Sequence, residues 1–203
     1  MPEFTTPDGL TLHYEVDGPA DAPTVVLSNS IGTNVALWEP IVPQLAERFR
    51  VVRYDSRGHG RSSTPAGDYT MADLAGDIVA ILDELGVARA HVVGLSVGGQ
   101  TGLTFALNHP DRLDRLVVSN TGAKIGTEQS WGDRAAKVRA EGLASIVDPV
   151  TAGWLTPGHA AAHPEQLSTM KGWFLGNDPE GYAGTCIALG HTDLGERLRD
   201  IAA

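Results

Sequence analysis

The sequence predicts an α/β protein with a mostly parallel sheet and helices on both of its faces. Short β-branched runs recur along residues 24–120, and amphipathic helical patterns lie between them. A third observation is the stretch from about residue 127, which reads as several short helices with no convincing strand. This helical stretch predicts a lid over the sheet.

Five segments are predicted to be strands. The first, "LTLHYEV", alternates apolar and polar residues as a half-exposed strand does. The other four are short β-branched runs, typical of parallel strands that are buried on both faces. The predicted strands span residues 10–16, 24–29, 51–55, 91–95 and 115–120.

Helical patterns separate these strands. An apolar residue recurs every four positions across residues 41–49. A fuller apolar stripe crosses residues 74–85. It follows a capping box formed by Thr70 and Asp73 and ends at Gly86, which indicates a complete amphipathic helix.

The chain is expected to divide into three parts. The sheet and its helices form a core over residues 1–126, and the short helices of the lid span residues 127–190. Residues 191–203 are expected to form a helix that leads back to the core, with Leu194 and Leu198 on its apolar face.

Composition argues against several functional classes. The net charge of −10 disfavours a nucleic-acid surface, which needs a basic stripe. No apolar stretch approaches the ~20 residues that cross a bilayer, and no secretory signal is visible, so a cytoplasmic protein is expected. With one cysteine and scattered histidines, the sequence contains no metal-ligand constellation, and no cofactor is implied.

One serine stands out, because glycines flank it directly after a predicted strand. In "HVVGLSVGGQ", Ser96 occupies the centre of a G-x-S-x-G pattern. Where a strand turns sharply into a helix, this pattern projects the serine from the carboxyl edge of a sheet as a nucleophile. The amino terminus of the following helix adds partial positive charge where an oxyanion forms.

With these residues the chain resembles the α/β-hydrolases, and within them the 3-oxoadipate enol-lactonases. The resemblance lies in "LSNSIGTNVALWEP" (27–40), "VVRYDSRGHGRSS" (51–63), residues 92–126 and "EGYAGTCIALGHTDLGERLRDIAA" (180–203). It implies an α/β-hydrolase fold with a helical lid. It also implies hydrolysis of a small enol-lactone in the catabolism of aromatic compounds, by attack of Ser96.

The resemblance also implies roles for other residues. The backbone N–H groups of Ile31 and Val97 are the expected oxyanion-hole donors. The substrate of the family carries a carboxylate, for which Arg134 is the first candidate partner. Trp131 and Trp154 are candidates to line the pocket. The plain alternative for the arginine and the tryptophans is a structural one: an exposed helical side chain and lid aromatics.

The catalytic acid and base are harder to find. Asp55 and His59 precede Ser96, whereas the α/β-hydrolase chain order is serine, acid, histidine, so both are interpreted as scaffold. His109 lies about twelve residues along the helix after Ser96, hence ~18 Å away. His159 and His163 fall in the predicted lid, and His191 has no strand to position it.

The sequence therefore predicts that the acid and base lie outside these 203 residues. By the family pattern, the fold is truncated before its last two strands, and roughly 60 residues are missing. "RLVVS" becomes an exposed edge strand, which a second polypeptide or a second copy would cover. The fragment alone is expected to be nearly inactive.

Two alternative functions remain. A carboxylesterase or a cofactor-free perhydrolase would use the same scaffold, because fold does not decide function. A protein of another class, a non-catalytic chain whose sheet edge serves assembly or ligand binding, would also fit.

Overall fold

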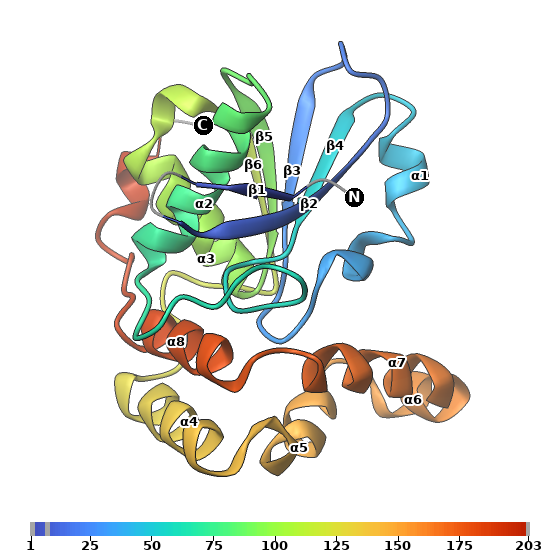
Figure 1. Ribbon diagram of the computed structural model, residues 1–203, viewed down its shortest axis with the longest axis vertical. Coiled ribbons are helices and arrows are strands. Elements are labelled where there is room, and N and C mark those ends of the chain that lie inside the picture. Colours follow the sequence, from blue (N-terminus) through green and yellow to red (C-terminus); the bar gives the residue numbers. More distant parts are fainter. Residues whose placement is uncertain (1–2, 7–8, 202–203) are drawn as a thin grey trace.

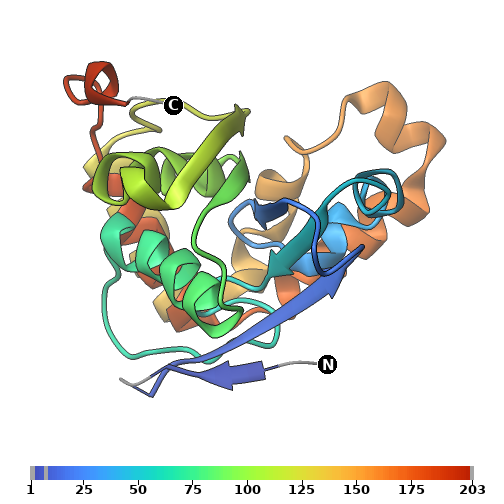
Figure 2. The same cartoon turned by 90° about the horizontal axis from the view of Figure 1, so that it is seen from above.

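The computed structural model describes residues 3–6 and 9–201, and its centre is a six-stranded sheet (Figure 1). The strand order is β1-β2-β4-β3-β5-β6. The β1–β2 and β2–β4 pairs are antiparallel, and the β4–β3, β3–β5 and β5–β6 pairs are parallel. Figure 2 shows β1 and β2 side by side at one edge. All five predicted strands are confirmed. The strand bounds are β1 Glu3–Thr5, β2 Thr11–Asp17, β3 Thr24–Ser28, β4 Arg50–Tyr54, β5 Ala90–Leu95 and β6 Leu113–Ser119.

Helices cover both faces of the sheet, as predicted. Val26 and Val52 point to the face covered by α2 (Met71–Glu84) and α3 (Val97–Asn108). Their neighbours Val25 and Val51 point to the opposite face, because successive side chains of a strand alternate. That second face is covered by a 3₁₀ helix, Val35–Trp38, and by α1, Val42–Leu45.

Helix α2 confirms the predicted start and end signals. The Thr70 hydroxyl accepts the Asp73 backbone N–H at 3.1 Å, and the Asp73 carboxylate accepts the Thr70 N–H at 2.7 Å. Gly86 follows the helix with a φ of +64°. The predicted 41–49 helix is shorter, only Val42–Leu45, and Ile41 is exposed while Phe49 packs against the sheet.

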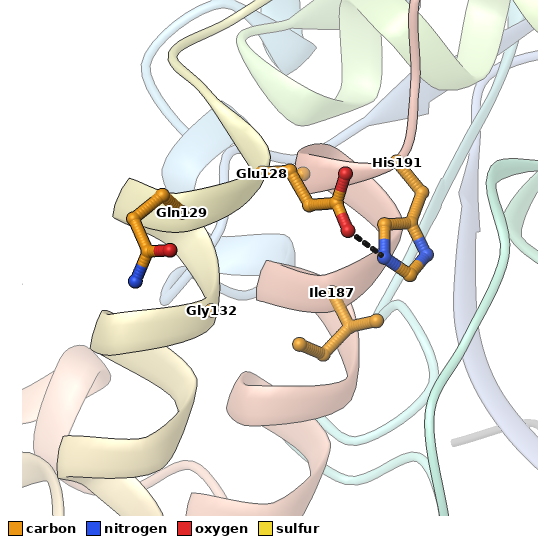
Figure 3. A pocket seen from close by; sticks show the side chains of 6 residues that line it. Glu128, Gln129, Gly132, Ile187 and His191 are labelled. Atoms are coloured by element: carbon orange, nitrogen blue, oxygen red, sulfur yellow. Dashed lines mark ion pairs between the residues drawn. The ribbon is translucent and has the colours of Figure 1, made fainter.

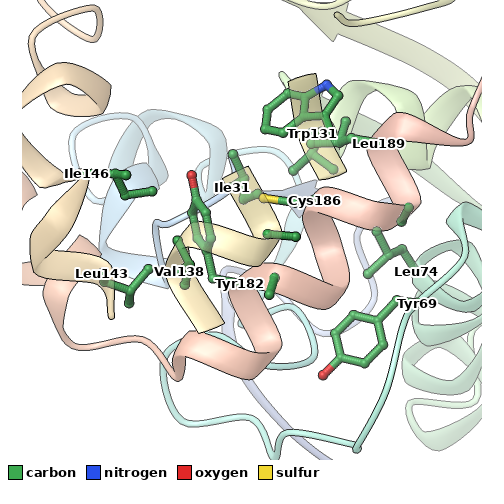
Figure 4. Close-up of a cluster of buried hydrophobic side chains, with 14 of the residues drawn as sticks. Ile31, Tyr69, Leu74, Trp131, Val138, Leu143, Ile146, Tyr182, Cys186 and Leu189 are labelled. Atoms are coloured by element: carbon green, nitrogen blue, oxygen red, sulfur yellow. The ribbon is translucent and has the colours of Figure 1, made fainter. Parts of the chain in front are cut away.

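Residues 128–190 form five α-helices and one 3₁₀ helix, Leu143–Ser145, which lie beyond one end of the sheet (Figure 1). Helices α4 and α8 pack side by side and share a buried apolar cluster with the loop after β3 (Figure 4). Ile31 of that loop contributes to this cluster together with Trp131, Tyr182 and Cys186. No helix in the described part of the chain is both long and apolar enough to span a bilayer. The helix bounds are α4 Glu128–Glu141, α5 Val147–Thr151, α6 Pro157–Ala162, α7 Pro164–Leu175 and α8 Pro179–Gly190.

The predicted helix over residues 191–203 is wrong as far as residue 201, and its last two residues lie outside the described part of the chain. The described residues up to 201 form turns and one 3₁₀ helix, Leu198–Asp200. The Asp193 carboxylate accepts the Gly195 N–H at 3.1 Å, and the Leu194 N–H donates to Ala123 O at 2.9 Å. These local and tertiary bonds compete with the helical ladder.

Strand β6 lies at the edge of the sheet opposite β1 in the described residues. Its pairing is with β5, and most of its side chains are exposed, including Val117 at 55% and Val118 at 39%. The predicted apolar edge strand is therefore present.

Candidate active site

Ser96 occupies a strained turn between β5 and α3. Its φ of +58° and ψ of −117° lie outside the regions that L-residues favour, a conformation typical of nucleophile elbows. The Ser96 N–H donates to Ser119 O at 2.9 Å, and the Thr121 hydroxyl donates to Ser96 O at 2.7 Å. A Cβ on Gly94 would overlap the backbone of Gly98. The turn therefore requires a glycine there.

Ser96 is half-buried and lines a cavity of about 450 Å³. The cavity lies between the carboxyl ends of the parallel strands and the helices of residues 128–190. Most of the residues predicted for the site meet here: Ser96, Ile31, Trp131, Arg134 and Trp154 all line the cavity. Val97, which follows Ser96, is 4% exposed and begins α3.

The loop after β3 is tied to the serine turn through Asn29. Its side-chain amide donates to Tyr54 O at 2.7 Å and accepts the Trp38 indole N–H at 2.6 Å. The Asn29 carbonyl accepts the Gly98 N–H at 3.1 Å. Within the described residues, the N–H groups of Ile31 and Val97 donate to no protein acceptor, so both amides are available to a ligand.

Arg134 is a cation without a carboxylate partner among the described residues. Its guanidinium carbon lies 4.6 Å from the centre of the Trp131 ring, within range of a cation–π interaction. Lys137 and Arg139 of the same helix pair instead with Glu141 at 3.9 Å and Glu180 at 2.6 Å. Arg134 therefore presents an uncompensated positive charge to the cavity.

The remaining cavity wall is largely apolar. Trp154 packs edge-on against Phe174, with ring centroids 6.0 Å apart. Beneath the cavity, burial raises the pKa of the Cys186 thiol to about 12, which keeps the thiol protonated and unreactive at neutral pH. Cys186 therefore does not compete with Ser96 as a nucleophile.

Asp55 and His59 are scaffold residues, as the sequence predicts. The Asp55 carboxylate accepts the backbone N–H groups of Val35 at 2.8 Å and Arg61 at 2.9 Å, and so ties two loops together. Burial raises the pKa of Asp55. His59 is buried with its Nδ1 3.1 Å from Arg57 O, and burial lowers its pKa to about 4.

The later histidines also lie away from Ser96. His109 follows α3 and packs against Phe105, and His159 of α6 packs against His163, which directly follows α6. His191 pairs with Glu128 at 3.4 Å in a separate pocket of about 470 Å³ between α4 and α8 (Figure 3). Their side chains are 61% and 78% exposed, so this contact is a solvated surface contact.

Within the described residues, no imidazole contacts Ser96, and no three His, Cys, Asp or Glu side chains gather as a metal site. The structure also places residues in the cavity wall that sequence reasoning missed, among them Thr33, Met170 and Asn120. Asn120 has a φ of +48° and directly follows β6. A polar residue at the carboxyl end of a predicted parallel strand was the sequence signal that could have placed it in the site.

Comparison with known proteins identifies the family of this fold. The profile described as the alpha/beta hydrolase fold matches residues 23–141. 3-oxoadipate enol-lactonase 2 of Acinetobacter baylyi is 39% identical over 207 residues, covering 100% of this chain and 78% of that protein. The putative carbamate hydrolase RutD of Caulobacter sp. is 42% identical over 206 residues, covering 97% of this chain and 75% of that protein.

Solved structures give the same result. The crystal structure of the enol-lactonase from Burkholderia xenovorans LB400 matches with a TM-score of 0.93 at 41% identity, covering 99% of this chain and 76% of that chain. Together with the curated relatives, it supports a hydrolase that acts on a lactone or an ester. The chain belongs to the α/β-hydrolase family and is similar in sequence and structure to 3-oxoadipate enol-lactonases.

Proposed function

We propose that this chain carries the nucleophile and the substrate pocket of an enol-lactone hydrolase, which opens 3-oxoadipate enol-lactone to 3-oxoadipate. One observation carries the choice of substrate: Arg134, without a carboxylate partner in the described residues, lines the same cavity as Ser96. A lactone that bears a free carboxylate supplies the missing anion. In a protein of net charge −10, such an anion needs a local cation of this kind.

The chemistry follows from the groups in the cavity. The Ser96 oxygen attacks the lactone carbonyl, and the Ile31 and Val97 amides stabilise the oxyanion. Collapse of the tetrahedral intermediate breaks the ring C–O bond and leaves an enolate on the acyl chain that is bound to Ser96. This enolate takes a proton and becomes the ketone. Water then hydrolyses the acyl-serine. Trp131 and Trp154 provide the apolar walls around the ring.

Activation of Ser96 needs a base that the described residues do not place beside it. We propose that the acid and base belong to polypeptide that pairs with the exposed edge of β6. Loss of the activating residues in serine hydrolases lowers kcat by about 10⁴- to 10⁶-fold. The 203-residue chain alone is therefore expected to turn over only slowly.

The test measures lactone hydrolysis by the chain alone and by a fusion protein. The fusion joins the chain to the segment of the Acinetobacter baylyi enol-lactonase that does not align with it. In the fusion, Arg134→Gln is expected to raise KM for the carboxylated lactone about 10- to 100-fold, because a hydrogen-bonded charge pair is lost. The KM for a neutral p-nitrophenyl ester should not change. The matched control is Lys137→Gln, which removes a cation of the same helix that already pairs with Glu141.

A carboxylesterase is the second candidate, favoured by the apolar lining of Leu37, Val150 and Met170. Turnover of neutral esters without turnover of the lactone or of a carbamate would favour it. If no ester is hydrolysed and Ser96 resists fluorophosphonates in the fusion, the non-catalytic alternative takes its place.

A further inference from the structure

Asn177 connects the helical residues 128–190 to the loop that carries the proposed oxyanion donor. It lies between α7 and α8 and is 6% exposed. Its side-chain nitrogen lies within hydrogen-bond distance of three backbone carbonyls: Trp173 O at 2.8 Å, Phe174 O at 3.0 Å and Gly32 O at 3.1 Å, the last of them 145 residues earlier in the chain. Its side-chain oxygen accepts the Gly60 N–H at 3.0 Å. One buried amide therefore links the loops after β3 and β4 to the end of α7.

The Gly32 carbonyl belongs to a tight turn. The Thr33 N–H donates to Ser30 O at 3.2 Å, and the Thr33 hydroxyl donates to the same oxygen at 2.8 Å. Gly32 has a φ of +79°, the conformation that the third residue of a type II turn requires. Ile31 is the second residue of this turn. The Asn177 amide therefore contacts the same four-residue turn that contains the Ile31 N–H.

Aromatic side chains hold the same residue from the helical side. A Cβ on Gly32 would lie 2.6 Å from the Phe174 ring and 3.4 Å from the Tyr182 ring. These rings come from α7 and α8, on either side of Asn177, and pack edge-on with centroids 5.1 Å apart. Both the packing of the two rings and the Asn177 amide therefore act on the turn at Gly32.

We propose that Asn177 is a positioning residue for the oxyanion hole: it orients the Ser30–Thr33 turn so that the Ile31 N–H points at the developing oxyanion. The inference rests on the proposed function for the substrate and for the role of the Ile31 N–H, whereas the contacts of Asn177 are independent of it. It gives the helices of residues 128–190 a role in transition-state stabilisation besides enclosing the cavity.

The decisive variant is Asn177→Asp, which keeps the side-chain size and the acceptor for the Gly60 N–H. It loses the amide donor to Gly32 O and, with it, the donor to the end of α7 at Trp173 O and Phe174 O. Removal of a complete oxyanion donor costs about 10²- to 10³-fold in kcat, so a misaligned donor is expected to cost about 10- to 100-fold. KM should stay within about two-fold, because the transition state is affected more than the ground state. Affinity for a boronic acid, whose serine adduct is tetrahedral, should fall in parallel.

The control for a merely structural role is Thr185→Val. Thr185 is buried in α8, and its hydroxyl donates to Gly181 O at 3.0 Å and not to the turn. Both variants should lower the melting temperature, but only Asn177→Asp should lower kcat and boronate affinity. The residual rate of the 203-residue chain suffices, because oxyanion holes retain about 10³- to 10⁴-fold catalysis without the triad.

Each outcome decides a separate claim. Parallel losses of kcat and boronate affinity in Asn177→Asp, absent from Thr185→Val, support the inference. If Asn177→Asp loses only stability, Asn177 is structural and the inference is overturned. If the wild-type chain turns over neutral esters but not the lactone, the proposed substrate fails, while ester kcat and boronate affinity still decide the role of Asn177.

Discussion

The close packing at Gly32 makes a quantitative prediction about the substitution Gly32→Ala. The left-handed conformation costs a residue with a Cβ roughly 1–2 kcal/mol. The new methyl group would also lie 2.6 Å from the Phe174 ring, and overpacking of this kind costs roughly 1–3 kcal/mol. Together the two effects predict a loss of roughly 2–5 kcal/mol from a total that is about 5–15 kcal/mol in natural proteins.

Thermal unfolding followed by circular dichroism measures this loss. A domain of this size loses about 2–4 °C per kcal/mol, so the melting temperature should fall by about 4–20 °C. Gly76→Ala is the matched control: Gly76 lies within α2, and no atom stands within 4 Å of its added Cβ. Alanine is about 1 kcal/mol better than glycine in a helix, so this control should melt slightly higher. Equal melting temperatures for the two variants would refute the packing argument.

Three further predictions follow from buried groups. Burial lowers the His59 pKa from 6.5 to about 4, so the native state keeps this ring neutral while the unfolded chain binds a proton. Its contribution to stability, roughly 3 kcal/mol, is present above pH 6.5 and lost as the pH falls towards 4. Urea titrations at pH 7 and pH 5 measure the free energy of unfolding at each pH. The difference between the two values should be smaller for His59→Asn than for the wild type. The Cys186 thiol, with a pKa raised to about 12, should resist iodoacetamide at pH 8 until urea unfolds the chain, and modification of the native protein would contradict its burial. Asp77→Ala should cost about 3–5 kcal/mol in the same urea titrations, because Asp77 is 2% exposed and pairs with Arg57 at 2.5 Å, and a cost below 1 kcal/mol would argue against this pair.

The sheet was predictable because its signals are local. A run such as "TVVLSN" is β-branched, apolar and short, and these properties favour a buried parallel strand whatever lies around it. The capping box at Thr70 and Asp73 and the glycines around Ser96 are equally local, and the structure contains both as predicted. The failed helix after residue 191 shows the limit of this reasoning. There the apolar repeat does not produce a helix, because the Asp193 side chain accepts the Gly195 N–H and the Leu194 N–H donates to Ala123 O instead of to a helical partner.

The candidate site was only partly predictable. The sequence indicated Ser96 from its motif, but it could not show that Arg134 lacks a carboxylate partner while Arg139, five residues later, has two. Such pairing depends on how α4 meets α8 and the loop before α2. The contact of Asn177 with Gly32 spans 145 residues and carries no local signature, so only the folded chain reveals it.

Rapid-quench mass spectrometry on the active fusion tests the central claim, that Ser96 is the nucleophile of a lactone hydrolase. Ring opening keeps every atom of the lactone on the acyl-enzyme. The peptide that contains Ser96 should therefore gain the full mass of the lactone within one turnover, and Ser96→Ala should gain none. Turnover by Ser96→Ala, or an adduct on another peptide, would contradict the account.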